Sequence, residues 1–288
     1  MQGGQGKAKK EARKAEQAKK QAQLNVLREA RELGSPLEGL PPAFSAFKRN
    51  GVDASLEFAT AKTLAQADRL AIHAILTENM APIYGKSEWE EEAKADKEKE
   101  LEEPDTRLLL VRSNAAATPS AEAGSSPASS PVKQPKEEEA KAEAAKDLLG
   151  FMHYRYEIEE ECLLVYIYEL QVANHETARR KGLGRFFLML AEMLAKKSGM
   201  SGVMLTVQRS NTAAQAFYKS CKYSVDSISP CKVDPLADDD DYAHEIYSKV
   251  WNAEARKLLD KRAEEAKKMW EAEHDGRIIT DENCVGGD

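Results

Sequence analysis

The sequence predicts an α/β (α+β) fold: a mixed central sheet flanked by helices, with a basic helical arm before it and a charged helix after it. Two apolar, alternating runs at 148–159 and 162–172 are typical of strands joined as a hairpin. An amphipathic helix follows Gly184, and the run GVMLTVQ at 202–208 predicts another strand. This strand–helix–strand order implies a crossover between parallel neighbours. The apolar face of the helix can pack on the sheet and consists of Leu183, Phe187, Leu190 and Leu194.

The chain begins with a basic helical arm, residues 1–33, that has little apolar surface to bury. Between Lys7 and Lys20 there are seven cations against two acids. Such a run is usually a solvated face, and the alternative is an arm that directs the chain to the nucleus or to an anionic partner. The glycines and prolines of GSPLEGLPPAF, 34–44, end the helix.

Packed structure is expected after this break. The alternation in VDASLEF, 52–58, predicts a strand. Thr63 and Gln66 form a capping box, which predicts a helix running to about Met80. The acidic run 86–105, with ten acids against four cations, is expected to be a solvated face.

A polar segment, 113–146, separates the strand predicted at TRLLLVR, 106–112, from the hairpin. It has no aromatic residue and a single Val as its only large aliphatic one. It therefore cannot offset its own ordering entropy, and we expect it to be disordered. Because the strands on either side are expected to pair, it is an insertion within a domain. The predicted domains are the arm 1–33, a domain 34–250 containing this insertion, and a charged helix and tail, 251–288.

Shorter elements complete the chain. They are a helix from Asn211 to Cys221, strands near Tyr223 and Ala243, and a helix from Trp251 to His274. The last helix has few large apolar residues, so it is expected to be mostly solvated.

Composition excludes several classes of protein. The net charge is −7, from 42 basic and 49 acidic residues, and there is no specific nucleic-acid motif. No apolar run approaches the ~20 residues of a membrane span. Without the apolar core of a signal peptide, the chain is expected in the nucleus and cytoplasm, with no membrane partner. The four cysteines lack zinc spacing, so they are expected to be reduced and structural, and no metal is expected.

The segment ARRKGLGRF, 178–186, places glycines at the start of the amphipathic helix. Free N–H groups and the positive end of the helix dipole can hold a phosphate there. The alternative is a tight turn that binds nothing. A Walker loop is excluded because no lysine follows the second glycine, and a dinucleotide fingerprint is excluded because Phe187 stands where it needs a third glycine or alanine. The remaining form is Arg-x-x-Gly-x-Gly, from Arg179 to Gly184.

This form resembles the pyrophosphate loop of the GNAT superfamily of N-acetyltransferases, which bind acetyl-CoA. LTV at 205–207 and NTAAQAFY at 211–218 follow it in the superfamily's order and spacing. Together with IYGKSEWEE at 83–91 and YIYELQV at 166–172, the chain resembles the NatD type, the histone-selective N-terminal acetyltransferases. The resemblance covers roughly residues 33–249 and implies a GNAT fold with acetyl-CoA as co-substrate.

The resemblance also implies roles for individual residues. Glu169 matches the catalytic glutamate. The backbone of Leu170, Gln171 and Val172 would hold the acetyl-pantetheine. The CoA-binding set is completed by Arg180, Lys181, Gly182, Leu183, Gly184, Arg185 and Asn211. The substrate-binding set is Tyr84, Trp89, Glu157, Ile158, Glu159, Tyr168, Thr206 and His244. His244 stands where the family has a tyrosine, which leaves open whether His244 or Tyr242 makes that contact.

The chemistry of the residues agrees with these roles. Acetyl transfer to an amine needs no cysteine nucleophile, and an α-amine titrates near ~8, so a carboxylate such as Glu169 can serve as base directly or through a water. Backbone N–H groups can polarise the thioester carbonyl. Glu157 and Glu159 lie two apart on one strand and form an acidic patch, whose natural partner is an arginine.

The expected function is transfer of acetyl from acetyl-CoA to the α-amine of histones four and two-A, whose tails begin Ser-Gly-Arg-Gly. Expected partners are these tails and, through the basic arm, chromatin or the ribosome. Two alternatives are open: an enzyme of the same fold acting on a lysine side chain or a small amine, and a CoA-binding scaffold without activity.

Overall fold

The computed structural model describes residues 3–41, 44–85, 88–114, 148–234 and 242–273. Its helices are α1 (Gly3–Glu32), α2 (Gln66–Tyr84), the π-helix η2 (Trp89–Ala93), α4 (Lys94–Glu102), α6 (Leu183–Lys197), α7 (Thr212–Ser220), α8 (Pro230–Val233) and α9 (Ala253–Glu273). Its strands are β1 (Ala46–Arg49), β2 (Val52–Thr60), β3 (Arg107–Ser113), β4 (Leu148–Glu159), β5 (Cys162–Val172), β6 (Gly202–Gln208), β7 (Ser224–Val225) and β8 (His244–Val250). The sequence prediction missed β1, η2, α4 and α8.

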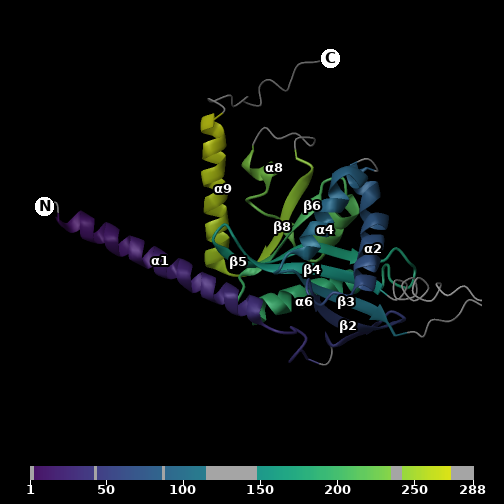
Figure 1. The fold of residues 1–288 in the computed structure, drawn as a ribbon. Coiled ribbons are helices and arrows are strands. Elements are labelled where there is room, and N and C mark those ends of the chain that lie inside the picture. The colour runs from purple at the N-terminus through teal and green to yellow at the C-terminus, as the bar shows by residue number, and fades with distance from the viewer. Residues whose placement is uncertain (1–2, 42–43, 86–87, 115–147, 235–241, 274–288) are drawn as a thin grey trace, which may run out of the picture. The chain divides into compact units, whose positions relative to one another are not determined.

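The described strands form one sheet in the order β1-β2-β3-β4-β5-β6-β8-β7. Figure 1 shows the fold and labels β2 to β6 and β8. β5 and β6, which α6 connects, are parallel, whereas β1 to β4 pair antiparallel. The sheet is therefore mixed and flanked by helices, which confirms the predicted fold class. β4 and β5 are joined by the two-residue turn Glu160–Glu161, and both residues have positive φ, 45° and 61°.

The chain divides into two compact units, and β4, β5 and α6 each contribute residues to both. The first unit comprises 1–32, 156–166 and 192–288; the second comprises 33–155 and 167–191.

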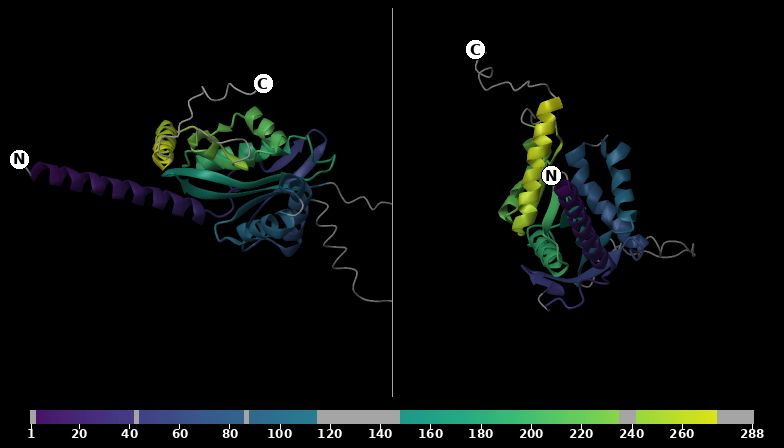
Figure 2. Two further views of the ribbon diagram at one scale, coloured as in Figure 1. Left: turned by 90° about the horizontal axis from the view of Figure 1, so that it is seen from above. Right: turned by 90° about the vertical axis from the view of Figure 1, so that its left-hand side faces the viewer.

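In the second unit, α2, η2 and α4 gather on one side of β3 and β4 (Figure 2). Large apolar side chains from these helices and strands form the core between them. Its fully buried members include Ile72, Leu76, Trp89, Leu108 and Phe151.

The start of α2 differs from the prediction. The capping box is wrong: Ala65 is the N-cap, and no side chain caps the helix. The Thr63 hydroxyl instead accepts a hydrogen bond from the Thr60 N–H at 2.9 Å, because it closes the turn after β2.

The strands on either side of the predicted insertion pair as expected. Arg107 to Val111 of β3 lie antiparallel to β4, and Leu109 lies opposite Met152. The insertion itself, predicted at 113–146, falls almost entirely outside the described residues.

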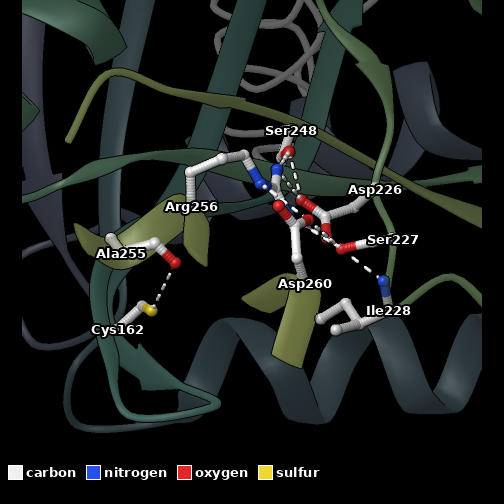
Figure 3. A network of polar contacts seen from close by, with 8 residues as sticks. All are labelled: Cys162, Asp226, Ser227, Ile228, Ser248, Ala255, Arg256 and Asp260. Atoms are coloured by element: carbon white, nitrogen blue, oxygen red, sulfur yellow. Dashed lines mark hydrogen bonds and ion pairs between the residues drawn. The ribbon is translucent and has the colours of Figure 1, made fainter. Parts of the chain in front are cut away.

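In the first unit, a polar network joins α9 to β8 and to Asp226, the residue after β7 (Figure 3). The Arg256 guanidinium contacts both carboxylate oxygens of Asp226, at 2.9 and 3.0 Å, and the Ser248 hydroxyl donates to the same carboxylate. Burial raises the pKa of Asp226, but the bonds from Arg256 and Ser248 outweigh it, so this pKa lies below its ordinary value. Beside the network, Leu259 packs into a small apolar cluster with Leu164 and others.

None of the helices in the described part of the chain is both long and apolar enough to cross a membrane. Cys162, Cys221 and Cys231 are free thiols. In the described part of the chain, no three or more His, Cys, Asp or Glu side chains are grouped so that they could hold a metal ion.

Candidate active site

The glycine segment forms a tight turn that leads into α6. Arg180 and Gly182 have positive φ, 58° and 97°, a region that favours glycine. Nearby side chains and backbone fix the turn: Asn50 Nδ2 donates to the Lys181 carbonyl at 2.7 Å, and the Arg179 N–H donates to the His175 carbonyl at 2.8 Å. The backbone at Gly182 is thus held in a conformation that would strain a residue carrying a side chain.

The first turn of α6 presents donors for an anion. The Phe186 N–H makes the first bond of the helical ladder, to the Gly182 carbonyl at 3.0 Å. The N–H groups of Leu183, Gly184 and Arg185 precede that bond and have no partner within the helix. Arg179, Arg180 and Arg185 are exposed around them. Free N–H groups, the helix dipole and these cations together make the start of α6 suited to an anion such as a phosphate group.

The packing of α6 holds this N-terminus in place. Its four predicted core residues, Leu183, Phe187, Leu190 and Leu194, are each at most 1% exposed. Gly150 of β4 allows the close approach, because a Cβ there would lie 2.6 Å from the Gln171 carbonyl oxygen and 3.3 Å from the Phe187 ring.

The Glu169 carboxylate lies in a buried polar cluster of the second unit, and its side chain is 8% exposed. Lys97 Nζ of α4 lies 3.0 Å from Glu169 Oε1. Gln171 Nε2 donates to Glu169 Oε2 at 2.8 Å. Asn79 of α2 orients that amide, since its Nδ2 donates to Gln171 Oε1 and to the Val172 carbonyl, both at 3.0 Å. Each oxygen of the predicted catalytic carboxylate therefore has a fixed partner.

Lys97 links Glu169 to a second acid, Glu100. Lys97 Nζ lies 3.1 and 3.3 Å from the two Glu100 oxygens. Burial lowers the pKa of Lys97, but Glu169 and Glu100 raise it more, so its pKa lies above the ordinary value. Burial raises the pKa of Glu100, although Lys97 opposes this. The solvated face predicted for 86–105 is thus wrong at Lys97 and Leu101, which face the core, because α4 packs against the sheet.

Tyr168 lies between two side chains of β4. The His153 ring stacks on it with centroids 5.0 Å apart, and the Arg155 guanidinium lies 4.3 Å from its centroid. His153 is fully buried and contacts the Thr106 hydroxyl at 3.2 Å. Burial, together with Arg155 and Lys97, lowers the pKa of His153 to about 3, so the imidazole is neutral at physiological pH.

Tyr84 and Trp89 pack on each other at a centroid distance of 5.9 Å. Tyr84 is half-buried and close enough to Lys97 to affect its pKa. Trp89 is 1% exposed and belongs to the apolar core, and its indole N–H has no hydrogen-bond partner within the described chain. Trp89 therefore contacts Tyr84 from within the apolar core.

The acidic patch of β4 lies in the first unit. Arg31 of α1 donates to the Glu157 carboxylate at 3.1 Å and to the Tyr156 carbonyl at 3.0 Å. Glu157 thus has an internal arginine as its partner. Glu159 is also half-buried, but no cation contacts it in the described part of the chain. Burial and the neighbouring Glu160 and Glu157 carboxylates raise its pKa.

The other predicted residues of the first unit lie on β4, β6, β8 and α7. Thr206 Oγ1 lies 2.5 Å from the Tyr166 hydroxyl. His244 is half-buried and pairs with Gln208 across β6 and β8. Tyr242 donates to Asp234 Oδ2 at 3.1 Å. Ile158 lies half-buried between the two glutamates, and Asn211 caps α7 by accepting from the Ala214 N–H at 3.1 Å.

Sequence reasoning missed Lys97, Glu100 and Asn79. The acidic run hid the first two, because a lysine and a glutamate three apart also occur on solvated helices. Leu101, an isolated leucine within that run, was the available signal that one face of the helix is buried.

The model of the acetyltransferase (GNAT) family matches residues 127–223. Among solved structures, the chain is similar to PaiA N-acetyltransferase of Thermoplasma acidophilum in complex with coenzyme A (17% identity, TM-score 0.40, covering 68% of this chain and 99% of that one). It is also similar to a GNAT-family acetyltransferase of Listeria monocytogenes (15%, 0.41, 71% and 99%). A third is the ribosomal-protein-alanine N-acetyltransferase of Brucella melitensis (11%, 0.36, 58% and 90%).

Proposed function

We propose that this chain is a GNAT acetyltransferase, which the match of residues 127–223 supports, and that it moves acetyl from acetyl-CoA to the α-amine of protein N-termini. The proposed substrates are histones four and two-A, whose tails begin Ser-Gly-Arg-Gly. The proposed setting is the nucleus and cytoplasm, with the basic arm α1 in contact with chromatin or the ribosome.

One observation carries the enzymatic part of this proposal. A single unit holds both the anion-binding start of α6 and, on the strand before it, a buried carboxylate paired with an ammonium. The first fits the CoA pyrophosphate, and the second is a base for the incoming amine. A scaffold that only bound CoA would have no use for Glu169 in such a setting.

The reaction needs a proton acceptor and a polarised carbonyl. The α-amine nitrogen attacks the thioester carbon, the carbon–sulfur bond breaks, and CoA leaves as a thiolate that takes up a proton. The proton of the amine passes to Glu169, directly or through a water. Leu170 to Val172 of β5 supply the backbone for the acetyl-pantetheine, and N–H groups there stabilise the charge on the thioester oxygen.

Substrate selection is assigned to the acidic patch, with Tyr84, Tyr168, Thr206 and His244 as further peptide contacts. Arg31 already pairs with Glu157, so Glu159 is the carboxylate that we expect to receive the third-residue arginine. Its raised pKa supports this assignment, because a bound guanidinium would relieve the repulsion from Glu157 and Glu160.

A double-mutant cycle between enzyme and peptide tests this selection. Glu159→Gln is expected to lower kcat/KM on a Ser-Gly-Arg-Gly peptide by about 10–100-fold, since a charge-assisted contact contributes roughly 1.5–3 kcal/mol. On Ser-Gly-Ala-Gly the same change should have little effect. Glu157→Gln is the matched control. It removes the contact with Arg31 but not the proposed contact with the peptide, so the ratio of kcat/KM between the two peptides should stay nearly unchanged.

The pH dependence gives a second readout of the same contact. The pKa of Glu159 is raised. The preference for the arginine peptide over the alanine peptide should therefore grow as the pH rises through this pKa, and it should be lost at lower pH, where Glu159 is protonated. If the changes in enzyme and peptide simply add, Glu159 does not read the arginine, and the histone assignment fails.

A further inference from the structure

We propose that Lys97 is a positioning residue for Glu169: its ammonium keeps the carboxylate charged and fixes the direction in which it accepts the amine proton. This inference rests on the proposed function, in which Glu169 is the base. It assigns a reaction role to a lysine of α4 within a run that looks, in the sequence, like a solvated face.

Both members of the Lys97–Glu169 pair are largely buried. The Glu169 side chain is 8% exposed and the Lys97 side chain 17% exposed. Burial without a partner would favour the neutral acid, and a protonated glutamate cannot take a proton from an amine. The Lys97 ammonium, 3.0 Å from Glu169 Oε1, stabilises the charged form that the reaction needs.

Both oxygens of the Glu169 carboxylate are held in place. Lys97 holds one carboxylate oxygen, and Gln171 holds the other at 2.8 Å. Gln171 cannot turn its amide round, because Asn79 Nδ2 donates to its Oε1 at 3.0 Å. A carboxylate has about four lone-pair sites, so two fixed contacts leave one site on each oxygen for the amine or a bridging water. The carboxylate is therefore aimed before the substrate arrives.

Further titratable and charged groups surround the Lys97–Glu169 pair. From α4, Glu100 shares the Lys97 ammonium at 3.1 and 3.3 Å. From α2, Tyr84 lies near Lys97, and from β4 the Arg155 guanidinium donates to the Glu100 carbonyl. His153 of β4 is neutral. The Lys97 ammonium is thus shared between two carboxylates, those of Glu169 and Glu100.

The test separates the charge of Lys97 from its shape. Lys97→Gln and Lys97→Met remove the charge, and the first retains a hydrogen-bond donor; Lys97→Arg retains the charge. The matched control is Lys99→Met on the same helix, where the lysine is 75% exposed and pairs with Asp96. The readouts are thermal unfolding, CoA affinity by calorimetry, the pH profile of kcat/KM, and the titration of the Glu169 carboxyl carbon by NMR, which needs no substrate.

Loss of the charge should move the acid limb of the pH profile to higher pH by about one unit or more, since a nearby opposite charge shifts a carboxyl by 1–3 units. The NMR titration of Glu169 should move in the same direction. CoA affinity should be unchanged. Lys97→Arg and Lys99→Met should keep the limb where the wild type has it. If Lys97→Met does not fold, Lys97→Gln gives the same comparison.

Two results would overturn the inference. The first is activity that falls equally at all pH values with an unmoved acid limb, because that is the signature of a structural ion pair. The second is an NMR titration of Glu169 that is the same with and without the ammonium. A failure of the proposed function gives a different result. If Glu169 is not the base, Glu169→Gln retains wild-type turnover, and this holds for any outcome of the NMR titration in the wild type and the Lys97 variants.

Discussion

In the proposed function, two glycines let a diphosphate approach the start of α6. Gly182, with a φ of 97°, shapes the turn, and Gly184 lies in the first turn of the helix among N–H groups that have no helical partner. A side chain on Gly184 would stand where the phosphates approach. The identity of these residues matters more for the ligand than for the fold.

We therefore expect Gly184→Glu to abolish CoA binding while the domain stays folded. The added side chain fills the phosphate site and sets a negative charge against a negative ligand, whereas Gly184→Ala adds only a methyl group and should weaken binding much less. Calorimetry with CoA and thermal unfolding measure the two effects separately. Unchanged CoA affinity in Gly184→Glu would show that the phosphates bind elsewhere.

The residues that could be predicted and those that could not differ in their kind of signal. Gly182, Gly184 and Arg180 belong to a local pattern, and Glu169 lies within the motif YIYELQV, so the sequence alone was enough to propose roles for them. Lys97 and Asn79 act from two helices that the fold brings to β5. Their role depends on contacts between residues far apart in the chain, and no spacing along the sequence records such contacts.

At the scale of elements, α9 depends on one buried ion pair. The Asp226 side chain is fully buried and Arg256 is 32% exposed, with both carboxylate oxygens in use. Removing one partner from a buried pair leaves a charge or a polar group without compensation, which costs roughly 3–5 kcal/mol. The network in Figure 3 thus attaches a helix that has only Ala255 and Leu259 buried.

Asp226→Asn should accordingly lower the free energy of unfolding by about 3 kcal/mol at pH 7, measured by urea denaturation. The folded-state pKa of Asp226 is lowered, so its contribution is present above the unfolded value, near ~3.9, and is lost as pH falls through the folded value. The difference between wild type and variant should shrink below about pH 4.

Asp260→Asn is the control for this prediction. Asp260 pairs with the same arginine at 3.2 Å, but it is 53% exposed, so its loss should cost less than about 1 kcal/mol. Equal losses in the two variants would mean that the buried pair does not hold α9.

The elements that the sequence predicted well are those in which apolar residues repeat regularly over many positions. The apolar stripe of α6 and the alternation of β2 and β5 survive in the structure because each buries one face. The short β1 and the charged α4 were missed, since neither shows a period of its own. The capping box at Thr63 failed because the hydroxyl closes a turn with Thr60.

At the scale of the whole molecule, the order of elements sets the chemistry. The crossover from β5 through α6 to β6 makes those two strands parallel neighbours. In the proposed function, the end of β5 with Glu169 and the start of α6 hold the two ends of the acetyl-CoA. The net charge of −7 is distributed unevenly, and the basic arm α1 carries an arginine that pairs with the acidic patch. The arm is thus joined to the rest of the first unit through Arg31.

The most direct test of the central claim is mass spectrometry of a Ser-Gly-Arg-Gly peptide that also contains lysine, incubated with the protein and acetyl-CoA. We expect one added acetyl group, located on the α-amine by fragmentation, and none with Glu169→Gln. Acetylation of the lysine side chain alone would contradict the N-terminal assignment and favour a lysine acetyltransferase. An unmodified peptide, from a protein that binds CoA by calorimetry, would contradict the enzymatic claim itself.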